Sequence, residues 1–197
     1  MALNAATLDA VNLGQRCPER ISRILVLGPV LPRPFQRRET LGTPWGEAIY
    51  RTMGSNPVLL RVMVRTGLRA WKVLGTRRFT AMQIGGSPAD LAVLEQPDAL
   101  LEFDRAMIES NTQGVESNVR EAQRIISDWT EATLSCQVPI ELIHGTEDPC
   151  TDIVVSRAFA KALPERVRLT EIPGAGFYSL FSHPDVVIPR LAAAAQA

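Results

Sequence analysis

One stretch restricts the folds open to this chain of 197 residues more than any other. Residues 140–143 form a short apolar run that follows a proline, which is typical of a buried parallel strand. Gly145 then ends the run. Residues 151–163 carry apolar side chains at helical spacing, and residues 167–172 form a second strand-like segment. The pattern predicts a right-handed βαβ unit, and therefore an α/β fold.

Asp148 is the candidate site residue of this unit. It follows the carboxyl end of the first predicted strand, where open α/β sheets place binding and catalytic groups. The neighbouring Cys150 has no identifiable histidine partner that would lower the pKa of its thiol. The three cysteines, Cys17, Cys136 and Cys150, lack CxxC or Cys/His spacing, so we expect free thiols and no metal site.

Composition excludes several classes of protein. The formal net charge is zero, which gives no basic footprint for nucleic acid. The chain contains no run of about 18 uncharged apolar residues, which is the length needed to cross a membrane. Residues 1–10 contain no Lys or Arg, so no secretory signal is expected and a cytoplasmic location is predicted. We expect no cofactor.

The order of the predicted elements suggests a core interrupted by an insert. Residues 5–16 read as a helix with no strand before it, and residues 21–27 read as a strand. With the βαβ unit, this predicts a parallel sheet of about three strands. Residues 1–35 would begin the core, residues 36–130 would form an all-helical cap, and residues 131–197 would complete the core.

The predicted cap contains a basic helix at about residues 57–74. Its charges recur at helical spacing, while no Asp or Glu occurs between residues 48 and 89. Such a face can bind an anionic membrane or an acidic partner. Alternatively, it is a solvated face balanced by a neighbouring acidic helix. The basic residues are Arg61, Arg65, Arg69 and Lys72, and the acidic residues are Asp98, Glu102, Asp104 and Glu109.

Four pieces of the chain, taken in order, resemble the carboxyl-terminal half of the α/β-hydrolase superfamily with a helical cap. They are residues 15–29, which enter a strand that ends in Gly28-Pro29, then the helical insert, then residues 143–148, and finally residues 172–176. The resemblance covers nearly the whole chain. It implies a partial α/β-hydrolase fold and a small-molecule substrate.

The resemblance also implies a catalytic triad in the chain order serine, acid, histidine. The acid would be Asp148, whose carboxylate would hold the catalytic histidine. The histidine would follow Gly176, where this chain has Phe177, and the serine would fall at Asn4. The first strands of the fold, with backbone donors for the oxyanion, would precede Met1.

The two histidines do not supply the missing base. We expect His144 to pack or to form a local hydrogen bond, and His183 to lie at the start of the last helix. No spacing pairs either of them with Asp148 and a nucleophile. Asp148 is then expected to be either a relic of the site or a carboxylate that caps its loop, and not a catalyst.

Three hypotheses follow for the function. In the first, the chain descends from hydrolases of a small ester, amide or epoxide but is inactive. In the second, it is part of a hydrolase gene whose upstream region is missing. In the third, it is a non-catalytic interaction module that self-associates through an exposed sheet edge or uses the basic helix.

Overall fold

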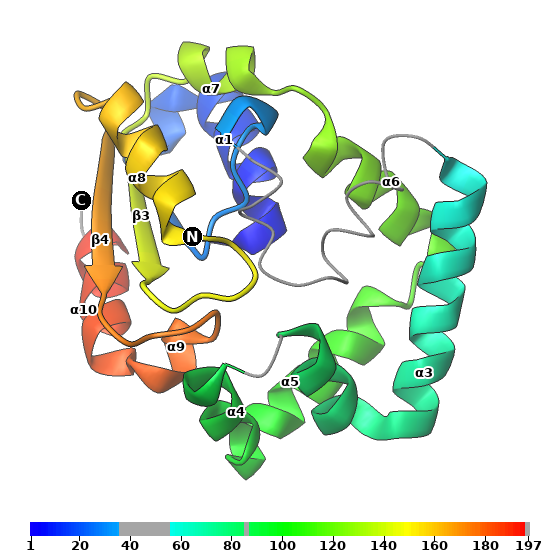
Figure 1. The fold of residues 1–197 in the computed structure, drawn as a ribbon. Helices are drawn as coiled ribbons and strands as arrows, with labels where there is room; N and C mark the ends of the chain where they lie inside the picture. The colour runs from blue at the N-terminus through cyan, green and yellow to red at the C-terminus, as the bar shows by residue number, and fades with distance from the viewer. Residues whose placement is uncertain (36–55, 85–86, 196–197) are drawn as a thin grey trace.

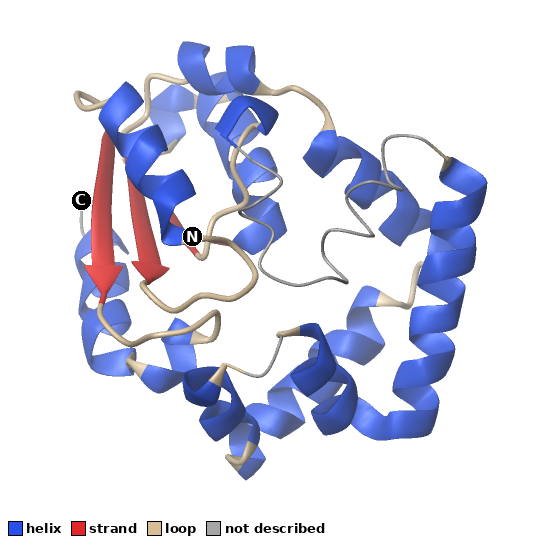
Figure 2. Cartoon of the chain, viewed as in Figure 1, coloured by secondary structure: helices blue, strands red, loops and turns tan. Residues whose placement is uncertain are grey.

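The computed structural model describes residues 1–35, 56–84 and 87–195 (Figure 1). Residues 36–55 and 85–86 of the predicted cap therefore lie outside the described residues. Helices lie around one small sheet and in a second group beside it (Figure 2).

The sheet has four parallel strands in the order β1-β2-β3-β4. They are β1 (Ala2–Leu3), β2 (Ile24–Leu27), β3 (Ile140–Gly145) and β4 (Val167–Ile172). The expected three strands are all present, but the expectation that no strand precedes the first helix is wrong. Ala2 pairs with Val26 and Leu3 with Leu27. A strand of two residues leaves no alternation in the sequence, and only its pairing with β2 defines it.

Helices cover both faces of the sheet. Successive side chains of a strand point to opposite faces, so Val26 packs with α1 (Thr7–Arg16) and α8 (Ile153–Ala162), whereas Leu27 packs with α10 (Pro184–Ala195). All four residues of β2 are buried. This double coverage explains why β2 reads as a continuous apolar run.

A helical insert separates β2 from β3 in the sequence. We use this name for α3 (Pro57–Gln83), α4 (Pro88–Leu94), α5 (Pro97–Ser110) and α6 (Val115–Ile126). Helix α3 is broken at Gly75, whose φ of 76° and ψ of 162° are open essentially to glycine alone. The shorter helices elsewhere are η1 (Asn4–Ala6), η2 (Pro18–Arg20), η3 (Arg33–Phe35), α7 (Thr130–Ser135) and α9 (Ser179–Ser182).

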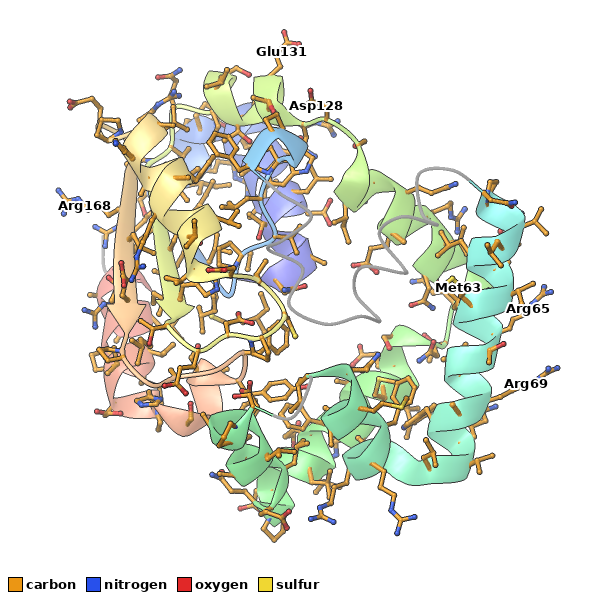
Figure 3. All side chains as sticks on the ribbon, viewed as in Figure 1. Met63, Arg65, Arg69, Asp128, Glu131 and Arg168 are labelled. Carbon is orange, nitrogen blue, oxygen red and sulfur yellow. The ribbon has the colours of Figure 1, made fainter. Side chains whose placement is uncertain are left out.

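The basic residues of α3 differ in their surroundings. Arg61 pairs with Glu116 of α6 at 2.7 Å, and Arg77 pairs with Glu95. Among the described residues, the four acidic side chains expected to balance this helix form no ion pair with it, although Asp104 accepts a hydrogen bond from Thr76 of α3. Arg65 and Arg69 point away from the rest of the molecule (Figure 3). Within the described residues no helix is both long and apolar enough to cross a bilayer.

Candidate functional site

The carboxyl ends of all four strands meet around Gly28. Asn4 follows β1, Gly28 follows β2, Asp148 lies in the turns after β3, and Phe177 follows β4. A Cβ atom at Gly28 would lie 3.4 Å from Oδ2 of Asp148 and 3.8 Å from Cδ2 of Phe177. The parallel sheet therefore brings together the three positions at which the resemblance would place a triad.

Asn4 has the backbone expected of a nucleophile elbow. It lies between a strand and a helical segment, and its φ of 46° makes it the one non-glycine residue with positive φ in the described part of the chain. Its Nδ2 donates a hydrogen bond to the carbonyl oxygen of Gly28 at 3.1 Å. Asparagine tolerates this conformation better than most residues do. Asn4 thus occupies an elbow, but its carboxamide is not a nucleophile.

Asp148 holds the loop that leaves β3. Its Oδ1 accepts hydrogen bonds from the backbone amides of Cys150 at 2.7 Å and Thr151 at 3.1 Å. Its Oδ2 lies 3.1 Å from Nε2 of His144. These contacts are those of a loop-capping carboxylate, one of the two roles expected for Asp148.

The expectation that no histidine pairs with Asp148 is wrong. Besides its contact with Asp148, Nε2 of His144 lies 3.0 Å from the carbonyl oxygen of Thr151. Nδ1 of His144 lies 2.7 Å from Oγ of Ser156. Because both partners of Nε2 are acceptors, Nε2 carries a proton, and Oγ of Ser156 is the partner of the other ring nitrogen. No sequence pattern marks this set of contacts, because Ser156 comes from a helix beyond the loop.

This Ser156–His144–Asp148 hydrogen-bonded set has the residue types of a triad but no access to a substrate. His144 and Ser156 are 0% exposed, and Asp148 is 8% exposed. A nucleophile must reach the atom that it attacks, and the hydroxyl of Ser156 is enclosed between α8 and β3. These hydrogen bonds therefore fix the fold of this region.

Asp90 connects the helical insert to the turn after β4. It lies on α4, is fully buried, and accepts hydrogen bonds from the backbone amides of Phe177 at 2.9 Å and Tyr178 at 2.7 Å. A Cβ atom at Gly176 would lie 2.2 Å from Oδ2 of Asp90, so this approach requires glycine. In the sequence, Asp90 is an acid that follows Pro88 at a helix start, and nothing there marks its contact with residues 177 and 178.

A small apolar pocket lies beside these residues. We call it the core–insert pocket, because Phe103 of α5 faces the turn after β4 across it. Its volume is about 120 Å³. The ring of Phe103 lies 4.4 Å from that of Tyr178 and 5.0 Å from that of Phe181. The pocket is lined by Leu3, Asn4, Leu27, Phe103, Phe177, Tyr178, Leu180 and Phe181.

Two potential nucleophiles near this pocket, the Cys150 thiol and the Tyr178 phenol, have raised pKa values. Burial, together with the charges of Asp148 and Asp90, raises the pKa of the Cys150 thiol, which is therefore protonated at neutral pH. Burial likewise raises the pKa of the Tyr178 phenol. Across residues 1–35, 56–84 and 87–195, no three His, Cys, Asp or Glu side chains form a group that could hold a metal ion.

Replacing Phe177 with histidine tests the placement of the missing base. In Phe177→His, the new imidazole should lie close to Asp148, and the carboxylate should raise its pKa above the usual value of about 6.5. Adding Asp148→Asn should lower that pKa by about one unit or more. Proton NMR of the imidazole resonances measures both values, with His183 as the internal control. An unchanged pKa in the double variant would contradict this geometry.

Asp90 should give the stability of the protein a pH dependence of defined sign. Burial raises the pKa of its carboxyl above the ordinary value, and the charge of Asp148 adds to the rise. The backbone hydrogen bonds from Tyr178 and Phe177 lower the pKa, but by less than burial raises it. A group with a raised folded-state pKa stabilises the fold below its unfolded pKa and loses that contribution as the pH rises through the folded pKa.

Asp90→Asn removes this titration. The free energy of unfolding of the wild type minus that of the variant should therefore fall as the pH rises from about 3 to about 7, as measured by urea denaturation. If this difference rose with pH, the backbone hydrogen bonds would outweigh burial, and the pKa of Asp90 would be lowered by folding.

Comparison with known proteins identifies the fold. No protein-family model and no curated protein matches the chain. Among solved structures, it matches E-2-(acetamidomethylene)succinate hydrolase with a TM-score of 0.62 and 13% identity, over 100% of this chain and 66% of that one. An α/β-hydrolase-fold protein from Nakamurella multipartita matches with a TM-score of 0.57 and 19% identity, over 98% and 66%.

An epoxide hydrolase from Bacillus megaterium also matches, with a TM-score of 0.56 and 10% identity, over 98% of this chain and 67% of that one. The chain thus spans about two thirds of the length of the hydrolases that it matches. At these identities, the comparisons establish the fold. The described strands and helices form a partial α/β-hydrolase fold.

Proposed function

We propose that this chain has no hydrolytic activity and that it binds a small apolar molecule in the core–insert pocket. One observation supports this most directly. Asn4 and Phe177 line the same pocket, and they stand at the two positions to which the resemblance assigns a serine and a histidine. The fold of a substrate site is retained, while the two groups that would carry out the reaction are replaced.

The replacements remove both chemical steps. A carboxamide at Asn4 cannot form an acyl intermediate, and the phenyl ring of Phe177 can neither accept nor donate a proton. Loss of a general base alone typically costs about two to four orders of magnitude in rate. Asp148 has no imidazole to orient on the pocket side, and its own histidine partner is buried behind it. We propose that hydrolysis of a small ester, amide or epoxide is the activity of the lineage, which this chain has lost.

The pocket suits a molecule about the size of one aromatic ring. Its walls are leucine and aromatic side chains, and its volume is about 120 Å³. An apolar cavity of about 150 Å³ lined by similar residues stays dry and binds benzene. Phe103 and Tyr178, whose rings lie 4.4 Å apart, supply aromatic faces and edges for such a ligand.

Binding without turnover is the expected result. Toluene should bind to the purified chain in isothermal titration calorimetry, and nitrophenyl acetate should release no nitrophenol above the buffer rate. Leu180→Phe fills the pocket and should weaken toluene binding by about tenfold or more, the equivalent of about 1.4 kcal/mol. Leu101→Phe, at an exposed site on α5 outside the pocket, is the matched control.

Two results would refute the proposal separately. Ester turnover that scales with protein and disappears in Asp148→Asn would show that the chain is an enzyme. Toluene binding that is equally strong in Leu180→Phe and in the wild type would show that the core–insert pocket is not the binding site.

The edge of the sheet favours self-association as a second candidate function. β1 is the edge strand of the described sheet, and Met1 and Leu3 are 64% and 48% exposed. Unpaired strand edges with apolar side chains promote pairing with another chain. We propose that two copies of the chain associate there.

Light scattering at micromolar protein concentration should then give a mass above that of the monomer. Leu3→Glu should restore the monomer by adding a charge at the edge, whereas Leu101→Glu, at a similarly exposed leucine of α5, should not. A monomeric wild type with a cooperative melt would contradict this proposal.

A further inference from the structure

The helical insert encloses a second cavity, separate from the core–insert pocket. Helices α3, α5 and α6 surround it, and its volume is about 250 Å³. The two cavities share no lining residue. Met63 lies on the side of α3 that faces α6, opposite to Arg65 and Arg69 (Figure 3). The lining residues are Leu60, Met63, Val64, Gly67, Leu68, Phe79, Gln83, Met107, Ser110, Asn111, Asn118 and Ala122.

The lining of this insert cavity combines an apolar body with several amides. Leucine, valine, phenylalanine and two methionines supply the apolar surface, and methionine adapts readily to different shapes. The polar groups are three carboxamides and one hydroxyl. Among the described residues no charged side chain lines the cavity, although α3 carries several cations on its other side. An uncharged molecule fits such a site, because burying an unpaired charge is costly.

The carboxamides are not equally engaged. Nδ2 of Asn111 donates to the carbonyl oxygen of Met107 at 2.6 Å, and Nδ2 of Asn118 donates to Oδ1 of Asn111 at 3.2 Å. Gln83 has no hydrogen-bond partner among the described residues. It offers a donor and an acceptor together, which is the complement of a primary amide.

Gly67 leaves part of the space open. It is buried in the interior of α3, where glycine is less favourable than alanine. A Cβ atom there would have Phe79 as its one near neighbour, with Cζ at 3.8 Å, which is an ordinary van der Waals contact. Packing therefore does not require glycine at this position, and its main effect is to enlarge the cavity.

We propose that the insert cavity is a binding site for a small uncharged molecule with an apolar body and a primary amide. The body lies against Met63, Phe79 and Met107, and the amide pairs with Gln83. The volume exceeds that of the roughly 150 Å³ cavities that hold one benzene ring, so a ring with an amide substituent fits.

Benzamide is the probe for this proposal, with benzoate and benzamidinium as charged molecules of the same shape. In protein labelled at the methionine methyl carbons, benzamide at millimolar concentration should shift the NMR signals of Met63 and Met107. The signals of Met1 and Met82, which do not line either cavity, should not move. The two charged analogues should bind at least about tenfold more weakly than benzamide.

Two variants separate filling of the cavity from loss of its hydrogen bond. Gly67→Leu should abolish the shifts at Met107, whereas Thr66→Leu, which adds its side chain at an exposed position of the same turn, should preserve them. Gln83→Leu should weaken benzamide binding about tenfold, because the amide of the ligand loses its hydrogen-bond partner. Gly67→Ala should raise the melting temperature.

Three results would overturn the proposal. They are the absence of shifts at Met63 and Met107, equal binding of benzoate or benzamidinium, and full benzamide binding in Gln83→Leu. If Gly67→Leu does not fold, Gln83→Leu decides the outcome. Because the methionine signals report only this cavity, the result is independent of ligand binding in the core–insert pocket.

Discussion

The carboxylate of Asp90 connects the helical insert to the core that contains the sheet. It is fully buried on α4 and accepts two hydrogen bonds from the turn after β4. A buried carboxylate without partners would be very costly, so these bonds tie α4 to this turn. They also fix the backbone at Phe177, and through it one wall of the core–insert pocket. The geometry of the candidate site thus depends on a contact between segments far apart in the sequence.

The site separates backbone geometry from chemistry. Asn4 has a positive φ between a strand and a helical segment, and Phe177 lies near Asp148. A carboxamide is a poor nucleophile and a phenyl ring takes up no proton, so neither side chain has the chemistry that the resemblance implies for its position. A fold therefore indicates where a site lies, whereas the side chains determine what it can do.

Features set by local sequence were predictable. The strand-like segments that became β3 and β4 lie next to proline or glycine residues, and β4 has the predicted limits. The turn that carries Asp148 was predicted to follow β3 because Gly145 ends the strand-like segment. The strand β1 was missed because two residues carry no periodic signal. Asp90 and the Ser156–His144 hydrogen bond were missed because they are defined by contacts between separate elements, which one sequence does not encode locally.

The break in α3 has a consequence for the shape of the insert. In a straight α-helix, residues 67 and 79 would lie about 18 Å apart along the axis. In this protein a Cβ atom at residue 67 would lie within van der Waals distance of the ring of Phe79, because the chain turns at Gly75. One helix thereby supplies two walls of the same cavity. The backbone angle of a single residue thus shapes the cavity, and a side chain at residue 75 would strain this conformation by about 1–3 kcal/mol.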